Sequence, residues 1–469
     1  MLRIQALCLI SVLSATFTNA QPCREVVGYY PGWQWYDRSQ AVNPFTIDYS
    51  KYTIINYAFF QPNPDGTVTG LDPWADENLL QGQINWSTTP PSHYPNTGLV
   101  DLAHNAGVKV LISVGGWTLS NNFPAIAADP ARRLTFAQSC ADLIAFYNLD
   151  GIDIDWEYPG FAEHSGTPAD EANYVLLLQQ VRQHLDALGI TNNETYLLTA
   201  ALPAGPSHME NIDWAGIEPL LDLMNIMSYD FNGTWNSECN HNSPLYEPAV
   251  SNPDFSCHDA ITQLLGPLNM PADKLVLGVP FYGRSMKTEG PPALFAPIQS
   301  GSPDYATFGV DEGTPLYYNI LEKAYLFEEH WDAQSHVPYL TGIGGLNTFV
   351  SFDNEASIVE KGNYIVQYDL AGAIIWEITG DYIETSPGSG IISATPLADA
   401  LNEALCTAPT CQGDFNGDGM INTSDLLMMM GEFGTECPED GCVSDITADG
   451  MVNVSDLLIL VALFGMSCL

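Results

Sequence analysis

Three acidic residues alternate with apolar ones in segment 150–159, which reads Asp-Gly-Ile-Asp-Ile-Asp-Trp-Glu-Tyr-Pro. Because alternate residues of a β-strand share a face, a strand here places Asp153, Asp155 and Glu157 on one side. Carboxyl groups about 7 Å apart on a buried face repel one another when ionised, so we expect at least one raised pKa. A carboxyl group that stays protonated near neutral pH is suited to protonate a glycosidic oxygen.

Two other interpretations of this segment are a metal site and a solvated acidic loop. A metal site calls for histidine or a second ligand cluster, and the other predicted strand ends offer none obviously. A solvated loop does not explain the alternation with Ile152, Ile154 and Trp156, which we expect to face covering helices. We therefore favour acid–base chemistry.

Short apolar, β-rich runs alternate with longer helical patterns between residues 26 and 378. The eight runs are 26–30, 52–60, 108–114, 151–157, 196–201, 223–229, 275–282 and 373–378. Near-continuous apolar strands separated by helices predict a parallel sheet covered on both faces. Eight such units predict an α/β fold, the (β/α)8 TIM barrel, with Glu157 at the carboxyl-terminal mouth where active sites lie.

The interval between the last two runs is far longer than the roughly two to six residues of an ordinary βα loop. We therefore expect an inserted subdomain at the catalytic face, over residues 287–364. Segment 396–405 reads as the closing helix, with Pro396 in its first turn, where a missing N–H costs nothing. The predicted catalytic domain is 21–405, followed by a linker over 406–413.

The N-terminus indicates the compartment, and the net charge excludes one class of partner. Residues 1–20 read as a signal peptide, with Arg3, an apolar run over 6–17 and a small-residue end. We therefore expect a secreted, extracellular protein, and no other stretch predicts membrane insertion.

The net charge is −43, from 13 Lys+Arg and 56 Asp+Glu. Such a surface repels phosphate backbones, so we expect no nucleic-acid partner.

Nine cysteines remain after the predicted signal peptide, and an odd number in an oxidising compartment leaves at least one without an internal partner. Cys140 lies in an apolar helical pattern and is our candidate for a free, buried thiol. Connectivity is open from sequence. The pairs considered are Cys239–Cys257, Cys437–Cys442, Cys406–Cys411 and, as an alternative to the last, Cys23–Cys406.

The carboxylate segment matches the Asp-x-x-Asp-x-Asp-x-Glu signature of family 18 glycoside hydrolases, the chitinase-like barrels. Further motifs of that family stand at matching strand ends: Ser113-Val-Gly-Gly-Trp117, Met227-Ser-Tyr229-Asp230, Tyr282-Gly-Arg284 and Trp376, with Tyr29 and Phe59 on the first two runs. The resemblance spans about 26–405. The long insertion is similar to the α+β subdomain that forms a cleft wall in one chitinase subgroup.

This resemblance implies a chitinase that cleaves β-1,4-linked N-acetylglucosamine in chitin or chitooligosaccharides with retention and without a catalytic cofactor. The family is an exception to the two-carboxylate scheme, because the substrate's acetamido group assists. Glu157 would be the acid and base, Asp155 would hold the acetamido N–H, Tyr229 would orient its oxygen and Asp153 would tune Asp155. The implied substrate contacts are Tyr29, Phe59, Gly116, Trp117, Tyr158, Met227, Asp230, Tyr282, Arg284 and Trp376.

Two alternative functions fit the same barrel. One is an endo-β-N-acetylglucosaminidase acting on glycoprotein glycans, and the other is a non-catalytic chitin-binding lectin. Lectin relatives typically lack the acid, whereas Glu157 is present. Trp33, Trp35 and Trp235 fit either a sugar cleft or the core, since pyranose faces stack on flat rings.

A twelve-residue pattern occurs twice near the C-terminus, at 414–425 and 445–456. Oxygen-bearing side chains at positions 1, 3, 5, 9 and 12, with glycine at position 6, follow the logic of a calcium loop. The expected Ca2+ ligands are Asp414, Asn416, Asp418, Met420 (carbonyl) and Asp425, then Asp445, Thr447, Asp449, Met451 (carbonyl) and Asp456. Thr447 is a weak ligand, so the second loop should bind more loosely.

Both copies end in aspartate where the EF-hand loop has glutamate. This departure and the tandem arrangement resemble a dockerin module, here 414–469, a small all-α calcium-loop domain. The resemblance implies a cohesin-like scaffold protein as partner and attachment at a cell surface. An acidic turn repeat without metal is the alternative.

Overall fold

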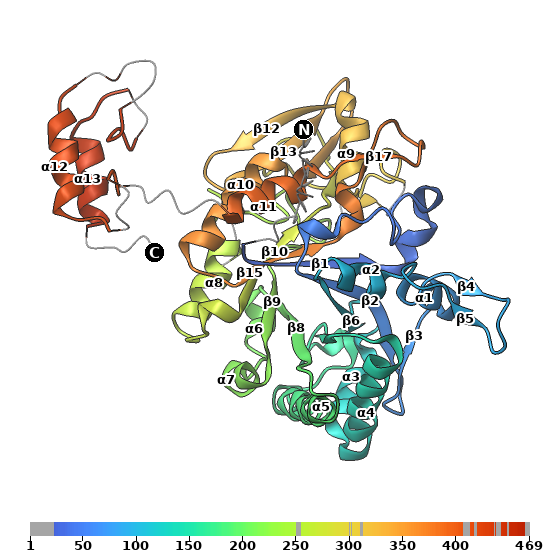
Figure 1. Ribbon diagram of the computed structural model, residues 1–469. Helices are drawn as coiled ribbons and strands as arrows, with labels where there is room; N and C mark the ends of the chain where they lie inside the picture. The colour runs from blue at the N-terminus through green and yellow to red at the C-terminus, as the bar shows by residue number, and fades with distance from the viewer. Residues whose placement is uncertain are drawn as a thin grey trace, which may run out of the picture.

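Eight parallel strands form a closed barrel (Figure 1). The computed structural model describes residues 23–249, 255–299, 301, 303–309, 313–406, 413–416, 420–435, 437, 442–447 and 450–464. The barrel strands are β1 (Glu25–Pro31), β2 (Ile54–Pro62), β6 (Lys109–Gly115), β7 (Gly151–Asp155), β8 (Leu197–Pro203), β9 (Leu223–Met227), β10 (Leu275–Pro280) and β15 (Gly372–Trp376). Parallel pairing of β1 with both β2 and β15 closes the barrel, and β3 (Val68–Gly70) adds antiparallel to β2. The predicted TIM barrel is confirmed.

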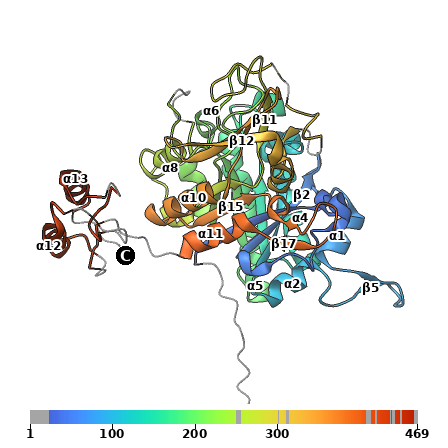
Figure 2. The same cartoon turned by 90° about the horizontal axis from the view of Figure 1, so that it is seen from above.

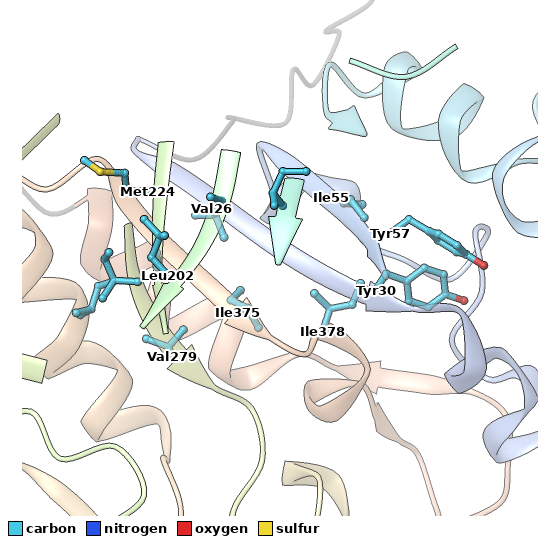
Figure 3. Close-up of a cluster of buried hydrophobic side chains, with 14 of the residues drawn as sticks. Val26, Tyr30, Ile55, Tyr57, Leu202, Met224, Val279, Ile375 and Ile378 are labelled. Atoms are coloured by element: carbon cyan, nitrogen blue, oxygen red, sulfur yellow. The ribbon is translucent and has the colours of Figure 1, made fainter. Parts of the chain in front are cut away.

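Strand residues alternate between two apolar layers, as a barrel requires. Val27, Ile54 and Ile374 belong to a buried cluster inside the barrel. The neighbouring Val26, Ile55 and Ile375 belong to the larger cluster between the strands and the helices. Figure 3 shows part of this outer layer, with residues contributed by several strands.

Helices surround the strands, and their ends follow from local sequence. They are α1 (Pro73–Leu80), α2 (Leu99–Asn105), α3 (Phe123–Ala128), α4 (Pro130–Tyr147), α5 (Asp170–Asn192), α6 (Pro206–Met209), α7 (Trp214–Ile217), α8 (Cys257–Leu265), α10 (Glu355–Gln367) and α11 (Pro396–Cys406). At α4 the Asp129 side chain accepts from the N–H groups of Ala131 and Arg132, and Asn148 ends the helix in the left-handed conformation. The closing helix expected over 396–405 is α11.

The long interval before β15 carries a four-stranded antiparallel sheet and a helix (gold in Figure 1). These are β11 (Arg284–Lys287), α9 (Tyr317–Lys323), β12 (Phe327–Asp332), β13 (Val337–Gly342) and β14 (Thr348–Ser351). The sheet begins three residues before the expected start at 287. The expected end at 364 falls within α10, which packs against barrel strands β10 and β15. Smaller hairpins pair β4 (Ile84–Asn85) with β5 (Ser92–His93) and β16 (Ile383–Glu384) with β17 (Ile392–Ala394); the first projects outward in both views (Figures 1 and 2).

The disulfides differ in part from expectation. Cys23 is bonded to Cys406, which joins the start of β1 to the end of α11 and rules out Cys406–Cys411. Cys437–Cys442 forms as expected, and Cys140 is a free, buried thiol as expected. The pairing of Cys239 with Cys257 is wrong, because both thiols are free and buried in different places.

The environments of these two thiols explain the error. Cys239 packs with Met286, Ile298 and Phe349 at the inserted sheet. Cys257 begins α8, where its thiol donates to the carbonyl of Ser228 at 3.4 Å. Proximity in the sequence therefore did not bring the two thiols into a bond. Cys411 and Cys468 lie outside the described residues.

The C-terminal module contains two short helices, α12 (Thr423–Glu432) and α13 (Val454–Ala462), which lie side by side (Figures 1 and 2). They are joined by a small apolar core of Ile421, Met429, Val452 and Leu460. Each helix begins with a capping box. The side chain of the N-cap asparagine accepts from the backbone N–H of an aspartate three residues later, and the side chain of that aspartate accepts from the backbone N–H of the asparagine. In the part of the chain that the structure covers, no helix combines the length and the hydrophobicity of a membrane span. The expected signal peptide, 1–20, lies outside the described residues.

Candidate active site

A cavity of about 970 Å³ opens at the carboxyl ends of the barrel strands. It takes side chains from β1, β2, β7, β8, β9 and β15, from the loop after β6 and other loops at this end of the barrel, and from the start of β11. Of the residues predicted from sequence, eleven line it: Tyr29, Phe59, Trp117, Asp155, Glu157, Tyr158, Met227, Tyr229, Asp230, Arg284 and Trp376. Asp153, Gly116 and Tyr282 are not among the residues that line this cavity.

Asp153 lies inside the barrel below the cavity and is fully buried. One carboxylate oxygen accepts from Tyr29 Oη at 2.8 Å and Ser113 Oγ at 2.7 Å. The other accepts from Thr199 Oγ1 at 2.6 Å and Asn225 Nδ2 at 3.1 Å. Burial raises the pKa of Asp153, and these four hydrogen bonds oppose the rise.

Asp155 lies two residues further along β7, on the same face, and is 3% exposed. Its Oδ1 is buried without a hydrogen-bond partner. Burial, followed by the charges of Glu157 and Asp153, raises the pKa of Asp155 well above its ordinary value. A buried carboxyl oxygen at the cavity wall with no partner is suited to receive a donor from a ligand.

Glu157 follows the end of β7 and is partly buried at the cavity wall. Burial raises its pKa to about 7 with help from the charge of Asp230, and hydrogen bonds from Tyr158 and the main chain of Trp117 oppose this. An acid with a pKa near neutrality can both donate and accept a proton at working pH. The raised pKa predicted for the carboxylate strand is therefore found on all three residues.

The opposite wall carries a carboxylate held by three donors. Asp230 accepts from Tyr282 Oη at 2.6 Å and from Arg284 Nε at 2.8 Å, and a second Arg284 nitrogen lies 2.6 Å from its other oxygen. The Arg284 guanidinium also lies 5.0 Å from the Trp235 ring centroid. A paired arginine and carboxylate present fixed donors and acceptors to a polar ligand. Tyr229 stands beside them, and burial raises the pKa of its hydroxyl, which therefore stays protonated.

Aromatic rings make up much of the cavity surface. Trp376 stacks on Phe59 with ring centroids 5.5 Å apart, and Trp33 lies 6.4 Å from Trp376. Such flat apolar faces suit the faces of pyranose rings. Gly116 contributes by being small, because a Cβ there would lie 2.6 Å from the Phe59 ring. Its φ of +89° also disfavours any other residue.

The tryptophans left open by sequence divide between cavity and core. Trp33 and Trp235 line the cavity, whereas Trp35 is partly buried and packs against the main core. Trp156 is 1% exposed and stacks on Phe123, so it faces the helices as expected.

Several residues that surround the carboxylates or line the cavity were not predicted from the sequence. Thr199 and Asn225, which hold Asp153, occupy inward positions of β8 and β9, and the two-residue strand period carries a signal for them. Ser113 was noted only as part of a motif. His208 and Leu71 also line the cavity, and nothing in the sequence distinguishes them from other loop residues.

The predicted calcium ligands lie in the C-terminal module. Asp425 is buried and folds back over the start of its loop, where it accepts from the N–H groups of Phe415 and Asn416 at 2.8 and 3.3 Å. Asp456 likewise accepts from the N–H and the hydroxyl of Thr447, both at 2.9 Å. In each loop the carboxylate at position 12 is therefore hydrogen-bonded to the residue at position 3. The predicted ligand positions offer oxygen atoms, which Ca2+ prefers, so the loops fit Ca2+. Asp418 and Asp449 lie outside the described residues.

Two family models match the chain. Residues 25–381 match the model "Glycosyl hydrolases family 18", and residues 412–464 match "Dockerin type I domain". Chitinase A1 of Niallia circulans is 33% identical, with 89% of this chain and 66% of that protein covered. Endochitinase 1 of Metarhizium robertsii is 31% identical, with 80% and 89% covered.

Solved structures show the same likeness. Chitinase ChiA74 from Bacillus thuringiensis superposes with a TM-score of 0.68 at 32% identity, covering 81% of this chain and 69% of that one. The Group IV chitinase of Ostrinia furnacalis, in complex with allosamidin, gives 0.70 at 28% identity, covering 81% and 98%.

Proposed function

Because this chain belongs to glycosyl hydrolase family 18 and ends in a dockerin type I domain, we propose that it is a secreted chitinase. The bond cleaved is the β-1,4 linkage between N-acetylglucosamine units of chitin and chitooligosaccharides. The observation that carries the proposal is the juxtaposition of an acid with a pKa near 7, Glu157, and an unpartnered buried carboxyl oxygen, that of Asp155, in an aromatic cavity.

The proposed reaction begins with proton transfer from Glu157 to the glycosidic oxygen, whose bond to the anomeric carbon then breaks. The substrate's own acetamido oxygen forms a new bond to that carbon, giving an oxazolinium ion. Asp155 accepts a hydrogen bond from the acetamido N–H and stabilises the positive charge, and Tyr229 donates to the acetyl oxygen. Glu157, now deprotonated, takes a proton from the incoming water. The water oxygen bonds to the anomeric carbon as the bond from the acetamido oxygen to that carbon breaks, which restores the acetamido group, and the two successive inversions retain the configuration.

The positions of these residues support this division of roles. Asp153 is held by four hydrogen bonds from other residues, and its charge acts on Asp155 through space. Glu157 stands at the mouth, where a leaving oxygen has access to solvent. Asp230 and Arg284 supply polar contacts to sugar hydroxyl and carbonyl groups on the facing wall.

The test is cleavage of a chitin hexamer, with products followed by mass spectrometry, by wild type, Glu157→Gln and Glu163→Gln. Glu163 lies exposed in the loop that follows the acid, so the third protein carries the same substitution away from the cavity. We expect shorter oligomers from wild type and Glu163→Gln, and a loss of about 10²- to 10⁴-fold with Glu157→Gln.

The same assay separates the alternatives. Release of glycans from a glycoprotein, with no cleavage of the hexamer, would favour the endo-β-N-acetylglucosaminidase. Binding of the hexamer by wild type and Glu157→Gln, with no cleavage by either, would favour the lectin.

We further propose that the module binds structural Ca2+ through its two loops and docks on a cohesin-like scaffold protein. Leu427 on α12 and Leu458 and Val461 on α13 are more than half exposed, which leaves apolar surface for a partner. Binding of a type I cohesin domain in the presence of Ca2+, and its release by a chelator, is the expected result. Disulfides Cys23–Cys406 and Cys437–Cys442 support secretion, since such bonds persist in oxidising compartments.

A further inference from the structure

We propose that His164 is a positioning residue that links the Trp117 ring at the cavity wall to the main chain of the acid Glu157. The inference rests on the proposed function of Glu157. His164 ends a short 3-10 helix, η4 (Ala162–His164), in the loop between β7 and α5. It is not among the residues that line the cavity, so it would act through its neighbours.

The imidazole touches both neighbours directly. Its Nδ1 lies 2.6 Å from the carbonyl oxygen of Glu157, and because a carbonyl only accepts, Nδ1 carries the hydrogen. Its ring centroid lies 4.5 Å from that of Trp117 in an edge arrangement. Trp117 lines the cavity and is 51% exposed. A sugar that stacks on Trp117 therefore contacts an indole ring whose position is fixed in part by the His164 imidazole.

The main chain of Glu157 is fixed on its other side as well. Its N–H donates to Ser120 Oγ at 2.9 Å, and that hydroxyl donates in turn to the carbonyl of Gly116. Both backbone polar groups of the acid are therefore tied to neighbouring loops. Since the side chain leaves from this backbone, the two ties set the direction of the carboxyl group toward the scissile bond.

The loop that carries His164 is itself held in place. Asp170, 1% exposed at the start of α5, accepts from the N–H groups of Gly160 at 3.1 Å and Thr167 at 2.8 Å. The N–H of His164 donates to the carbonyl of Phe161 at 3.0 Å. The imidazole is thus oriented before any substrate arrives, which is what a positioning group requires.

The test uses two substitutions that remove different halves of this contact. His164→Phe keeps a ring against Trp117 and loses the donor. His164→Asn keeps an N–H at the place of Nδ1 and loses the ring. His184 on α5 provides matched controls, His184→Phe and His184→Asn, because its Nδ1 also bonds a main-chain carbonyl, that of Gln180 at 2.8 Å, away from the cavity. kcat and KM are measured on the chitin hexamer, alongside melting temperatures.

We expect His164→Phe to lower kcat about tenfold or more while KM changes by less than about twofold. His164→Asn should recover most of the lost kcat, and both His184 variants should match wild type. The proposal is overturned if His164→Phe keeps the kcat of wild type, or if the two His164 variants lose activity equally, as loss of packing alone would cause. Failure of the chitinase proposal is a separate outcome, because wild type itself would then leave the hexamer uncut.

Discussion

Asp153 and Asp155 share one face of β7, yet the first accepts four hydrogen bonds while Oδ1 of the second has none. Both are buried, and burial raises the pKa of each. The difference lies in their partners. The Asp153 carboxylate is fully engaged with side chains of the barrel, whereas Asp155 has a buried acceptor oxygen that remains available to a ligand in the cavity. Asp153 should therefore contribute to stability and Asp155 should cost stability, in return for function.

Replacing each aspartate by asparagine should change stability in opposite directions. The folded pKa of Asp155 lies above its unfolded value of about 4, so wild type loses stability as the pH rises above about 4. Asp155→Asn removes this loss and should raise the free energy of unfolding at pH 8 by about 1 kcal/mol or more. Asp153→Asn should lower it by about 1–3 kcal/mol, because one carboxyl oxygen becomes an amide nitrogen and its two donors lose their acceptor, a cost that we expect to exceed the gain from removing the buried charge.

Urea unfolding at pH 5 and pH 8 checks both values, and kcat on the chitin hexamer should fall for Asp155→Asn despite its greater stability. An Asp155→Asn protein less stable than wild type at pH 8 would contradict the assignment.

The pH dependence should follow the acid form of Glu157. Because Glu157 acts as a protonated acid in the proposed mechanism, and burial raises its pKa to about 7, kcat/KM should fall as the pH rises through about 7. Asp230→Asn removes a charge that raises this pKa, so the basic limb should move to lower pH. A fluorogenic chitobioside measured between pH 4 and pH 10 gives both profiles. Activity that stays constant up to pH 9 would be incompatible with this pKa.

The Cys23–Cys406 disulfide should stabilise the barrel strongly, because it bridges a sequence separation of 383 residues. In the chain-entropy account, closing so long a loop restricts the unfolded chain most. Replacing both cysteines by serine should lower the free energy of unfolding by about 2–5 kcal/mol. Replacing Cys437 and Cys442, separated by 5, should leave the barrel transition unchanged. Thermal unfolding of the full chain measures both, and equal effects would refute the prediction.

Calcium should bind the two loops of the module with different affinities. The first loop has Asn416 at position 3, whereas the second has Thr447, whose hydroxyl already donates to Asp456. Titration of the full chain with CaCl2 should therefore show a tighter and a weaker site. Asp425→Ala should remove the tighter site and Asp456→Ala the weaker one. Cleavage of the chitin hexamer should not change in either variant. Two equal sites in wild type would show that position 3 does not decide affinity.

The sequence alone determined the barrel and the family, and it indicated Glu157 as the acid that we propose. The apolar runs repeat eight times with helical intervals, and a repeat of that kind has few packings that bury both faces. The shared face of Asp153, Asp155 and Glu157 could be predicted because the side-chain period of a strand is two. That prediction does not depend on which strands lie next to this one. The duplicated loops could be recognised for a similar reason, since their predicted ligands are local in sequence.

Tertiary structure decided everything that depends on which distant segments meet. Thr199 and Asn225 reach Asp153 only because β7, β8 and β9 are adjacent in the closed barrel. Cys239 and Cys257 do not pair, although they are near in sequence, because each packs in a separate apolar cluster. The contact of His164 with Glu157 and Trp117 has no sequence signal, because a lone histidine in a loop becomes meaningful only when folding places its ring between two other elements.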